Sequence, residues 1–285
     1  MKLALLVIGL LALCACTPKS LEEGPFVDPQ FANLIPADTT LLMGVSVERL
    51  VQTPVYQKYL NGFPIPAFEQ FGQRTGIDPE KKLWQVLFVS NGKSGYWVGR
   101  GKFSDELMAP DFTQPGMKRF GYKGLTFFGT EQKSLVLFNS STAGIGDTSV
   151  LRTVVDQRIA SIAPPVKLAA LQKQIPHDVQ VWAVWAGGAV DVALPGNLSN
   201  LTRVMQSMES ATMYLDLTTN VKGIVSGTAV SDRAAEDVQG AIQSLLALTG
   251  AKNAALFNGI QVTRQGRAVQ IKVDAPPEIL GLLLR

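Results

Sequence analysis

The chain shows the same local pattern twice, and this repetition limits its possible folds more than any other feature. The turn at 35–38 (IPAD) precedes an apolar run at 41–45, and the turn at 175–178 (IPHD) precedes an apolar run at 179–185. Proline has no N–H to donate to a β-ladder, so it suits a position just before a strand. Each turn therefore predicts the start of a β-strand, one in each half of the chain.

The elements that follow are expected in the same order in both halves. Asn91-Gly92 is the strongest hairpin signal, because both residues tolerate the backbone angles of a two-residue turn. In the second half, Ser231-Asp232 begins an amphipathic helix that we expect to end at Gly250. The first half gives strands at 83–90, 95–103, 124–129 and 134–138 and helices at 55–60, 66–75 and 147–162. The second half gives strands at 211–217, 221–230, 259–264 and 268–273 and helices at 195–207, 233–249 and 277–284.

Each half thus reads as strand, helix, hairpin, helix, hairpin, helix, except that a Pro- and Gly-rich stretch after Ser104-Asp105 predicts a short or lost middle helix in the first half. Helices packed on a mainly antiparallel sheet predict an α+β fold, here built from two duplicated units. We place the first unit at 31–163 and the second at 166–285, separated by a Pro-rich segment. The shared order of elements, rather than any long identical block, supports the duplication. The sequence leaves open whether the units form one continuous sheet or two.

The N-terminus resembles a bacterial lipoprotein signal. Lys2 precedes an apolar run at 3–13, which is too short to span a bilayer because a spanning helix takes about 20 residues. The tetrad 13–16 (LCAC) then matches the lipobox, with Cys14 at a place that usually holds Ala, Ser, Val or Thr. The resemblance implies that the thiol of Cys16 receives a diacylglyceryl group and that the chain is cut just before it.

This resemblance makes residues 1–15 a signal peptide and residues 16–30 a tether. Cys16 would carry two or three acyl chains such as palmitate, enough for a lasting membrane anchor. The chain has two cysteines, and removal of the signal leaves only Cys16, so no internal disulfide can form. Thr17 stands where Asp retains many lipoproteins in the inner membrane, which favours the outer membrane where one exists. The alternatives are an ordinary cleaved signal that releases a soluble protein and an uncleaved anchor.

Composition limits the partners of the folded body. The formal net charge is +3, with 17% charged and 46% hydrophobic residues. Such a chain has enough apolar residues to form a core and too little basic charge to bind a polyanion such as a nucleic acid. We therefore expect no nucleic-acid partner.

The sequence predicts no cofactor, no metal site and no catalytic group. His177 is the single histidine; we expect a solvated loop residue, since a zinc site or a Ser–His relay needs further partners. The segment 90–94 (SNGKS) contains Ser-x-x-Lys, which resembles penicillin-binding enzymes, and Gly-Lys-Ser, which resembles a phosphate loop. Its place between two strands instead predicts a hairpin turn.

Two sets of aromatic residues suggest contact surfaces. The segment 118–123 (KRFGYK) alternates cations with rings, which suits either an exposed strand edge defended by charge or contact with anionic headgroups or a partner. The four tryptophans are Trp84, Trp97, Trp182 and Trp185. Adjacent Tyr96 and Trp97 point to opposite faces, so we expect one of them to be exposed. Trp182 and Trp185 also point to opposite faces, so we expect at most one of them to be buried. Exposed rings would line a seam between the halves or a ligand groove.

These observations predict a lipid-anchored protein of the bacterial cell envelope with a non-catalytic binding or structural role. The partner would be another envelope protein or an apolar ligand, in addition to the membrane. The body resembles uncharacterised secreted bacterial proteins, a likeness that implies no activity. The alternative is an envelope hydrolase that uses a carboxylate pair drawn from loop residues such as Asp105, Glu106 or Asp232.

Overall fold

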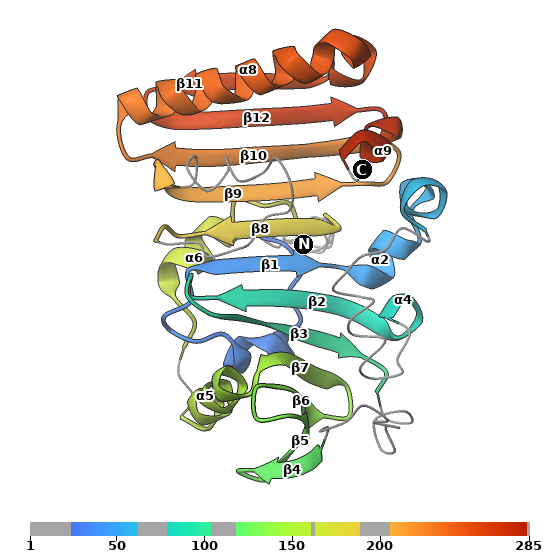
Figure 1. The fold of residues 1–285 in the computed structure, drawn as a ribbon, viewed down its shortest axis with the longest axis vertical. Coiled ribbons are helices and arrows are strands. Elements are labelled where there is room, and N and C mark those ends of the chain that lie inside the picture. The colour runs from blue at the N-terminus through green and yellow to red at the C-terminus, as the bar shows by residue number, and fades with distance from the viewer. Residues whose placement is uncertain (1–23, 62–78, 104–117, 161–162, 189–205, 284–285) are drawn as a thin grey trace, which may run out of the picture.

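A single antiparallel sheet of twelve strands runs the length of the molecule (Figure 1). The computed structural model describes residues 24–61, 79–103, 118–160, 163–188 and 206–283. The strand order is β11-β12-β10-β9-β8-β1-β2-β3-β7-β6-β5-β4, and every neighbouring pair is antiparallel. The predicted α+β class is therefore confirmed, and the two halves share one sheet.

The strands are β1 (Leu41–Val45), β2 (Leu83–Ser90), β3 (Gly95–Gly101), β4 (Lys118–Tyr122), β5 (Leu125–Gly129), β6 (Lys133–Asn139), β7 (Thr142–Asp147), β8 (Val181–Trp185), β9 (Met208–Asp216), β10 (Val221–Ala229), β11 (Ile260–Gln265) and β12 (Ala268–Ala275). The helices are η1 (Pro29–Leu34), α2 (Val47–Val51), η2 (Tyr56–Leu60), α4 (Pro79–Lys82), α5 (Thr148–Ile159), α6 (Val166–Gln172), α8 (Asp232–Phe257), η4 (Pro277–Ile279) and α9 (Leu280–Leu283).

The two halves join through β1 and β8, which pair directly at the centre of the sheet. Both strands follow the Pro-containing turns and are short apolar runs, as a strand buried on both faces requires. Read outward from this pair, the order is β1-β2-β3-β7-β6 on one side and β8-β9-β10-β12-β11 on the other.

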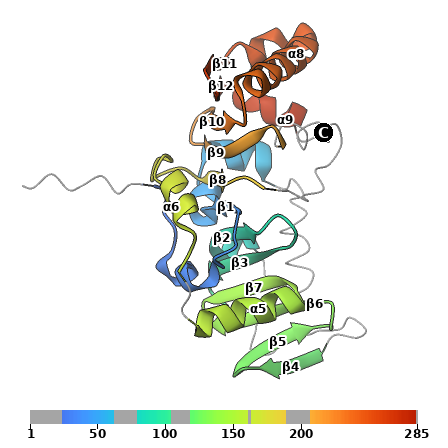
Figure 2. The ribbon, with the colours of Figure 1, turned by 90° about the vertical axis from the view of Figure 1, so that its left-hand side faces the viewer.

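Helices cover both faces of the sheet. On one face, which we call the η1 face, η1, α5 and α6 pack on buried residues of the central strands, including Leu42, Leu87 and Trp182. On the opposite α8 face, α2, α9 and the long helix α8 pack on residues such as Val86, Val221 and Val269. Figure 2 shows the sheet nearly edge-on, with α6 on one side and α8 and α9 on the other.

The first half contains two strands beyond the repeated pattern that the sequence predicts. The hairpin of β2 and β3 and the pair β5–β6 are confirmed, whereas β4 and β7 stand beyond the expected pattern. β7 was not predicted because Gly144 and Gly146 weaken a strand signal. The structure explains both glycines, since a Cβ at Gly144 would lie 2.9 Å from the Phe138 ring and one at Gly146 would lie 2.7 Å from Cβ of Tyr96.

The second half follows the expected order more closely. Both of its hairpins form, β9–β10 and β11–β12. The expectation that the long helix ends at Gly250 is wrong, because α8 continues to Phe257. A helix-interior glycine costs only about 1 kcal/mol relative to alanine, which a long packed helix can absorb. The helices expected at 66–75 and 195–207 fall on ranges outside the described residues, apart from the last two positions of the second.

Candidate functional site

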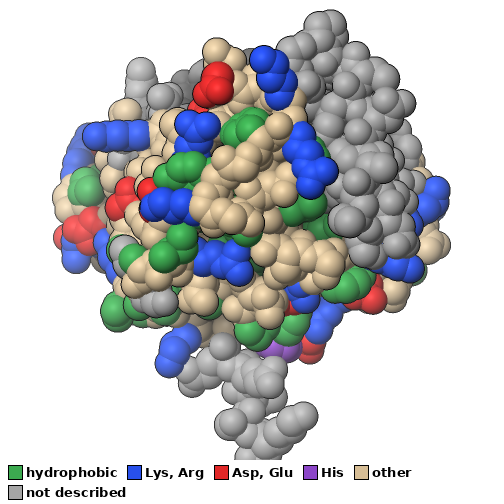
Figure 3. All heavy atoms as spheres, turned by 90° about the horizontal axis from the view of Figure 1, so that it is seen from below, with side chains coloured by type: hydrophobic (Ala, Val, Ile, Leu, Met, Phe, Trp, Pro, Cys, Tyr) green, Lys and Arg blue, Asp and Glu red, His purple; other side chains and the backbone are tan. Residues whose placement is uncertain are grey.

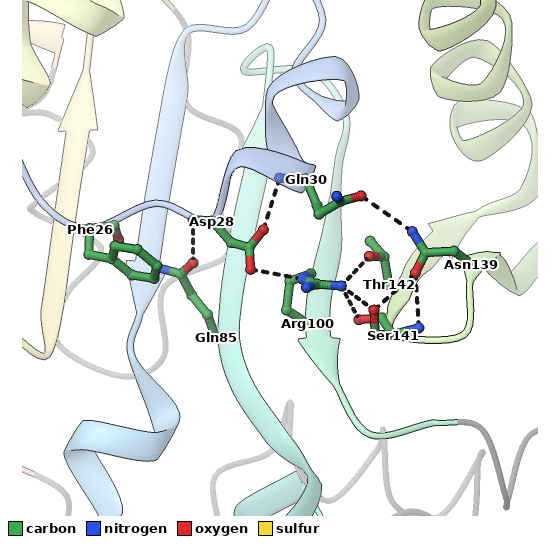
Figure 4. Close-up of polar contacts among 8 residues, drawn as sticks. All are labelled: Phe26, Asp28, Gln30, Gln85, Arg100, Asn139, Ser141 and Thr142. Carbon is green, nitrogen blue, oxygen red and sulfur yellow. Dashed lines mark hydrogen bonds and ion pairs between the residues drawn. The ribbon is translucent and has the colours of Figure 1, made fainter.

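The first described residues form a clamp at the centre of the sheet. We use the name N-terminal clamp for the segment 24–30 together with Gln85, Arg100 and His177, which hold it. Figure 4 shows the segment running into η1, with Gln85 of β2 and Arg100 of β3 reaching it from the sheet. Cys16 lies eight positions before Gly24, so the clamp is the described part of the body that follows the predicted lipid most closely in the chain.

One end of the segment is held by the second half of the molecule. The N–H of Phe26 donates to the carbonyl of His177 over 3.3 Å, and Nδ1 of His177 lies 3.1 Å from the carbonyl of Gly24. The two rings meet edge to face with centroids 5.9 Å apart. Arg49 adds a cation–π contact to Phe26 and an ion pair of 3.2 Å with Asp178. His177 is thus half-buried and engaged, not the solvated residue that we expected.

The other end is held by the first half. Gln85 lies on β2 and is buried, and its amide contacts the segment twice. Its Oε1 accepts from the N–H of Asp28 over 2.8 Å, and its Nε2 donates to the carbonyl of Phe26 over 2.6 Å. A buried amide that is satisfied on both sides fixes the backbone it contacts, since breaking either bond leaves a buried polar group without a partner.

An ion pair between Asp28 and Arg100 completes the clamp. Oδ2 of Asp28 lies 2.9 Å from Nε of Arg100, and the two side chains are only 18% and 14% exposed. The other carboxylate oxygen accepts from the N–H of Gln30 over 2.9 Å and so caps η1. The carboxylate therefore joins the start of η1 to strand β3 through charge-assisted hydrogen bonds.

Arg100 also ties the clamp to the turn between β6 and β7. Its Nη1 donates to the carbonyl and the hydroxyl of Ser141 and, over 3.1 Å, to the hydroxyl of Thr142. Its guanidinium lies 5.5 Å from the ring centroid of Trp84. Asn139 in the same turn contacts Gln30 over 3.5 Å. These bonds occupy the polar groups of the clamp with one another, so the arrangement is suited to holding a segment in place (Figure 4).

The tryptophans are more buried than predicted. Trp182 and Trp185 do point to opposite faces, but they are 1% and 3% exposed, so the expectation that both cannot be buried is wrong. The reason is that β8 lies at the middle of a sheet covered on both faces. Tyr96 is buried and Trp97 is half-buried against Phe88, so neither is fully exposed. Trp84 is 42% exposed and carries the Arg100 contact.

The segment 90–94 forms the predicted hairpin turn. Oδ1 of Asn91 accepts from the N–H groups of Lys93 and Ser94, at 3.1 and 3.0 Å, which closes the turn. Asn91 Nδ2 also donates to Asp38 over 2.8 Å. The turn borders a small pocket of about 190 Å³ between this hairpin and α5. Asp38 is the acidic residue among those that line the pocket.

The remaining candidate residues are scattered. Cys16, Asp105 and Glu106 lie outside the described residues. Asp232 is exposed at the first turn of α8, far along the chain from the clamp.

Among the described residues, no group of three or more His, Cys, Asp or Glu side chains is placed to hold a metal ion. The same described part of the chain contains no helix long and apolar enough to cross a membrane.

The segment 118–123 is confirmed as a sheet edge, since β4 is the last strand in the order. Its hairpin with β5 is fastened to α5 by Asp156. Lys123 Nζ lies 2.8 Å from the carboxylate of Asp156, and the hydroxyl of Tyr122 donates to it at 3.0 Å. The hydrogen bond from Lys123, helped by that from Tyr122, holds the pKa of Asp156 below its ordinary value of 3.8.

Replacement of Asp156 by asparagine is expected to loosen the β4–β5 hairpin while the central strands keep their order. A carboxylate whose pKa is lowered by folding stabilises the folded state above its ordinary pKa, and this contribution is lost as the pH falls through the folded value. Protection factors of the β4 and β5 amides, which correct for the pH dependence of intrinsic exchange, should therefore fall in Asp156→Asn, and in the parent protein below about pH 4. Equal exchange in the variant and the parent at neutral pH would contradict this role.

The comparisons with known proteins concern the fold. No protein-family model and no curated protein sequence matches the chain. The Treponema pallidum protein TP0453 has a similar structure. Its crystal form III gives a TM-score of 0.60 at 11% identity, covering 91% of this chain and 98% of that chain. Crystal form I gives a TM-score of 0.53 at 11% identity, covering 91% and 97%. At such low identity the likeness shows a shared fold alone.

Proposed function

We propose that the protein is a lipoprotein of the bacterial cell envelope that is anchored through Cys16 and acts by binding another envelope component. The lipobox at 13–16 supports the anchor. The observation that carries the proposal is the N-terminal clamp, which holds the chain just downstream of the predicted lipid by a half-buried ion pair and a buried amide. Such a clamp is useful where the N-terminus transmits force from a membrane anchor or fixes the orientation of the folded body relative to the membrane.

The clamp also limits how far the body can stand from the membrane. Gly24 lies eight positions after Cys16, and eight extended residues span at most about 28 Å. The clamp lies on the η1 face, so this face would be turned towards the membrane surface. Thr17 after the lipidated cysteine favours the outer membrane where one exists.

A binding role is supported by β4, whose exposed residues at the end of the sheet offer both charge and backbone groups. A protein partner in the envelope suits such an edge better than an apolar ligand does, because Lys118 and Arg119 would have to lose their hydration against apolar surface. We therefore place the membrane at the N-terminal clamp and the partner protein at the sheet edge.

Replacement of Cys16 by serine is expected to abolish incorporation of labelled palmitate and to remove the protein from the lipid-anchored membrane fraction. The physical reason is that the thiol is the single site for the diacyl group, and each buried methylene contributes about 0.8 kcal/mol of membrane affinity. Metabolic labelling followed by fractionation measures both effects.

Cys14→Ser is the matched control, since it removes the neighbouring thiol while keeping a small residue at that place in the lipobox. It should be labelled and fractionate like the parent protein. Labelling that persists in Cys16→Ser, or disappears in Cys14→Ser, would contradict the assignment of the lipid to Cys16.

We also infer that the two halves arose by duplication of one unit. The matching outward strand orders on either side of the β1–β8 pair support this inference. On this view β6–β7, rather than the predicted β5–β6, corresponds to β11–β12, and the β4–β5 hairpin is an addition of the first half.

A further inference from the structure

Among the described residues, no strand pairs with the outer side of β4, which leaves its outward backbone groups in a defined pattern. The turn after it consists of Lys123 and Gly124, with φ of 46° and 81°, as in the type I′ turn of a two-residue hairpin. In such a hairpin the residues that flank the turn exchange hydrogen bonds, and the pairs then alternate. Phe120 therefore bonds to Phe127 on β5, and the N–H and C=O groups of Arg119 and Gly121 point away from β5.

Two side chains at the start of β4 are basic and exposed. Lys118 and Arg119 are exposed, and no ion pair is found for either among the described residues. On the η1 face Arg152 lies over the rings of Phe120 and Tyr122, at 5.6 and 5.4 Å. The view from this end of the sheet shows Lys and Arg side chains spread among apolar ones over the described surface (Figure 3).

We propose that β4 is a docking edge for an extended, acidic segment of another envelope protein, which adds to the sheet as a thirteenth strand. The outward groups of Arg119 and Gly121 would supply about four backbone hydrogen bonds. Acidic side chains at alternate positions of the segment would meet Lys118 on one face or Arg119 on the other. This inference rests on the binding role proposed above and names the partner for it.

The charge of the edge distinguishes this partner from a second copy of the chain. A second β4 strand carries the same two cations and no carboxylate, so edge-to-edge pairing of two copies would leave Lys118 and Arg119 without an opposite charge. An acidic strand gains attraction from the same cations, and Gly121 leaves room for its approach because a Cβ there would have its nearest neighbour at 4.0 Å.

The test measures binding of labelled ten-residue peptides to the full-length protein in detergent by fluorescence anisotropy. One pool has Glu at alternate positions, and matched pools have Gln or Lys there. We expect members of the Glu pool to bind, and Gly121→Pro to weaken that binding at least tenfold, because proline removes the outward N–H without disturbing the ladder to β5.

Gly121→Ala is the matched control, since it keeps the N–H and adds its Cβ in open space; it should bind like the parent. Arg119→Glu should also weaken binding about tenfold, whereas Lys222→Glu, which makes the same charge change at an exposed residue of β10, should not. Unchanged amide exchange in β5 shows that Gly121→Pro keeps its hairpin.

The proposal is overturned if the Glu pool binds no better than the Gln pool, or if Gly121→Pro binds like Gly121→Ala. Binding to phosphatidylglycerol vesicles that Gly121→Pro leaves unchanged, without binding to the Glu pool, would assign the basic edge to a lipid surface and overturn the peptide-docking proposal as well. Palmitate labelling at Cys16 tests the anchor separately, so the two proposals can fail independently.

Discussion

Replacement of Gly44 by alanine is expected to lower the free energy of unfolding by about 3 kcal/mol, the upper part of the range for overpacked cores. Gly44 lies on β1 directly opposite Trp182 on β8. A Cβ at Gly44 would fall 2.3 Å from two atoms of the Trp182 indole and 2.5 Å from a third. The indole is 1% exposed, so it has no free space into which it can move.

The effect should be large because this contact lies where the two halves join. A rotated indole or a displaced β1 would disturb the single pairing between β1 and β8, and with it the core beneath η1, α5 and α6. Urea unfolding followed by tryptophan fluorescence measures the change. A double variant that adds Trp182→Leu should recover part of the loss, since the smaller side chain leaves room for the new methyl group.

Gly240→Ala is the matched control for this glycine substitution. Gly240 is an exposed residue within α8, and a Cβ there would meet no atom within 4 Å. Alanine should stabilise the protein by up to about 1 kcal/mol, because glycine in a helix loses more backbone entropy on folding. Equal effects of the two substitutions would contradict the steric explanation for Gly44.

Replacement of Arg100 by methionine is expected to destabilise the protein by about 2–3 kcal/mol and to release the N-terminal clamp. The substitution leaves the carboxylate of Asp28, which is 18% exposed, without its cation. Breaking a fully buried pair costs about 3–5 kcal/mol, and partial exposure of both side chains reduces that figure. Amide exchange at 26–34 should quicken more than exchange in β10 and β12.

The double variant Asp28→Asn, Arg100→Met separates lost charge pairing from lost packing. Removing both charges should restore part of the stability, because no unpaired carboxylate remains and the asparagine can still cap η1. If the double variant is less stable than Arg100→Met by the full cost of Asp28→Asn alone, the two residues are not coupled and the clamp is wrongly assigned.

Local signals in the sequence predicted those elements whose formation depends on neighbouring residues. The Asn91-Gly92 turn predicted the hairpin of β2 and β3, and Ser231-Asp232 predicted the start of α8. Missed elements depend on distant partners. β7 was not predicted because its glycines weaken a strand signal, although they make room for Phe138 on the neighbouring strand β6 and for Tyr96 on β3.

The N-terminal clamp could not be predicted from the sequence, because its residues also lie far apart in the chain. Asp28 lies 72 positions from Arg100, and Gly24 lies 153 positions from His177. Asp28-Pro29 does signal a helix start, but a carboxylate before proline is common and does not reveal which arginine it meets. Residues 24–30, which the sequence assigned to a tether, lie against the body because these distant groups hold them.

The sequence by itself determined the α+β class, the antiparallel pairing of neighbouring strands and the expected site of lipid attachment, because each depends on short-range patterns. Only the tertiary structure decided that the two halves share one sheet through β1 and β8 and that Trp182 and Trp185 are both buried. These features depend on contacts between residues far apart in the chain. Local propensity does not specify such contacts, whereas packing on both faces of the sheet does.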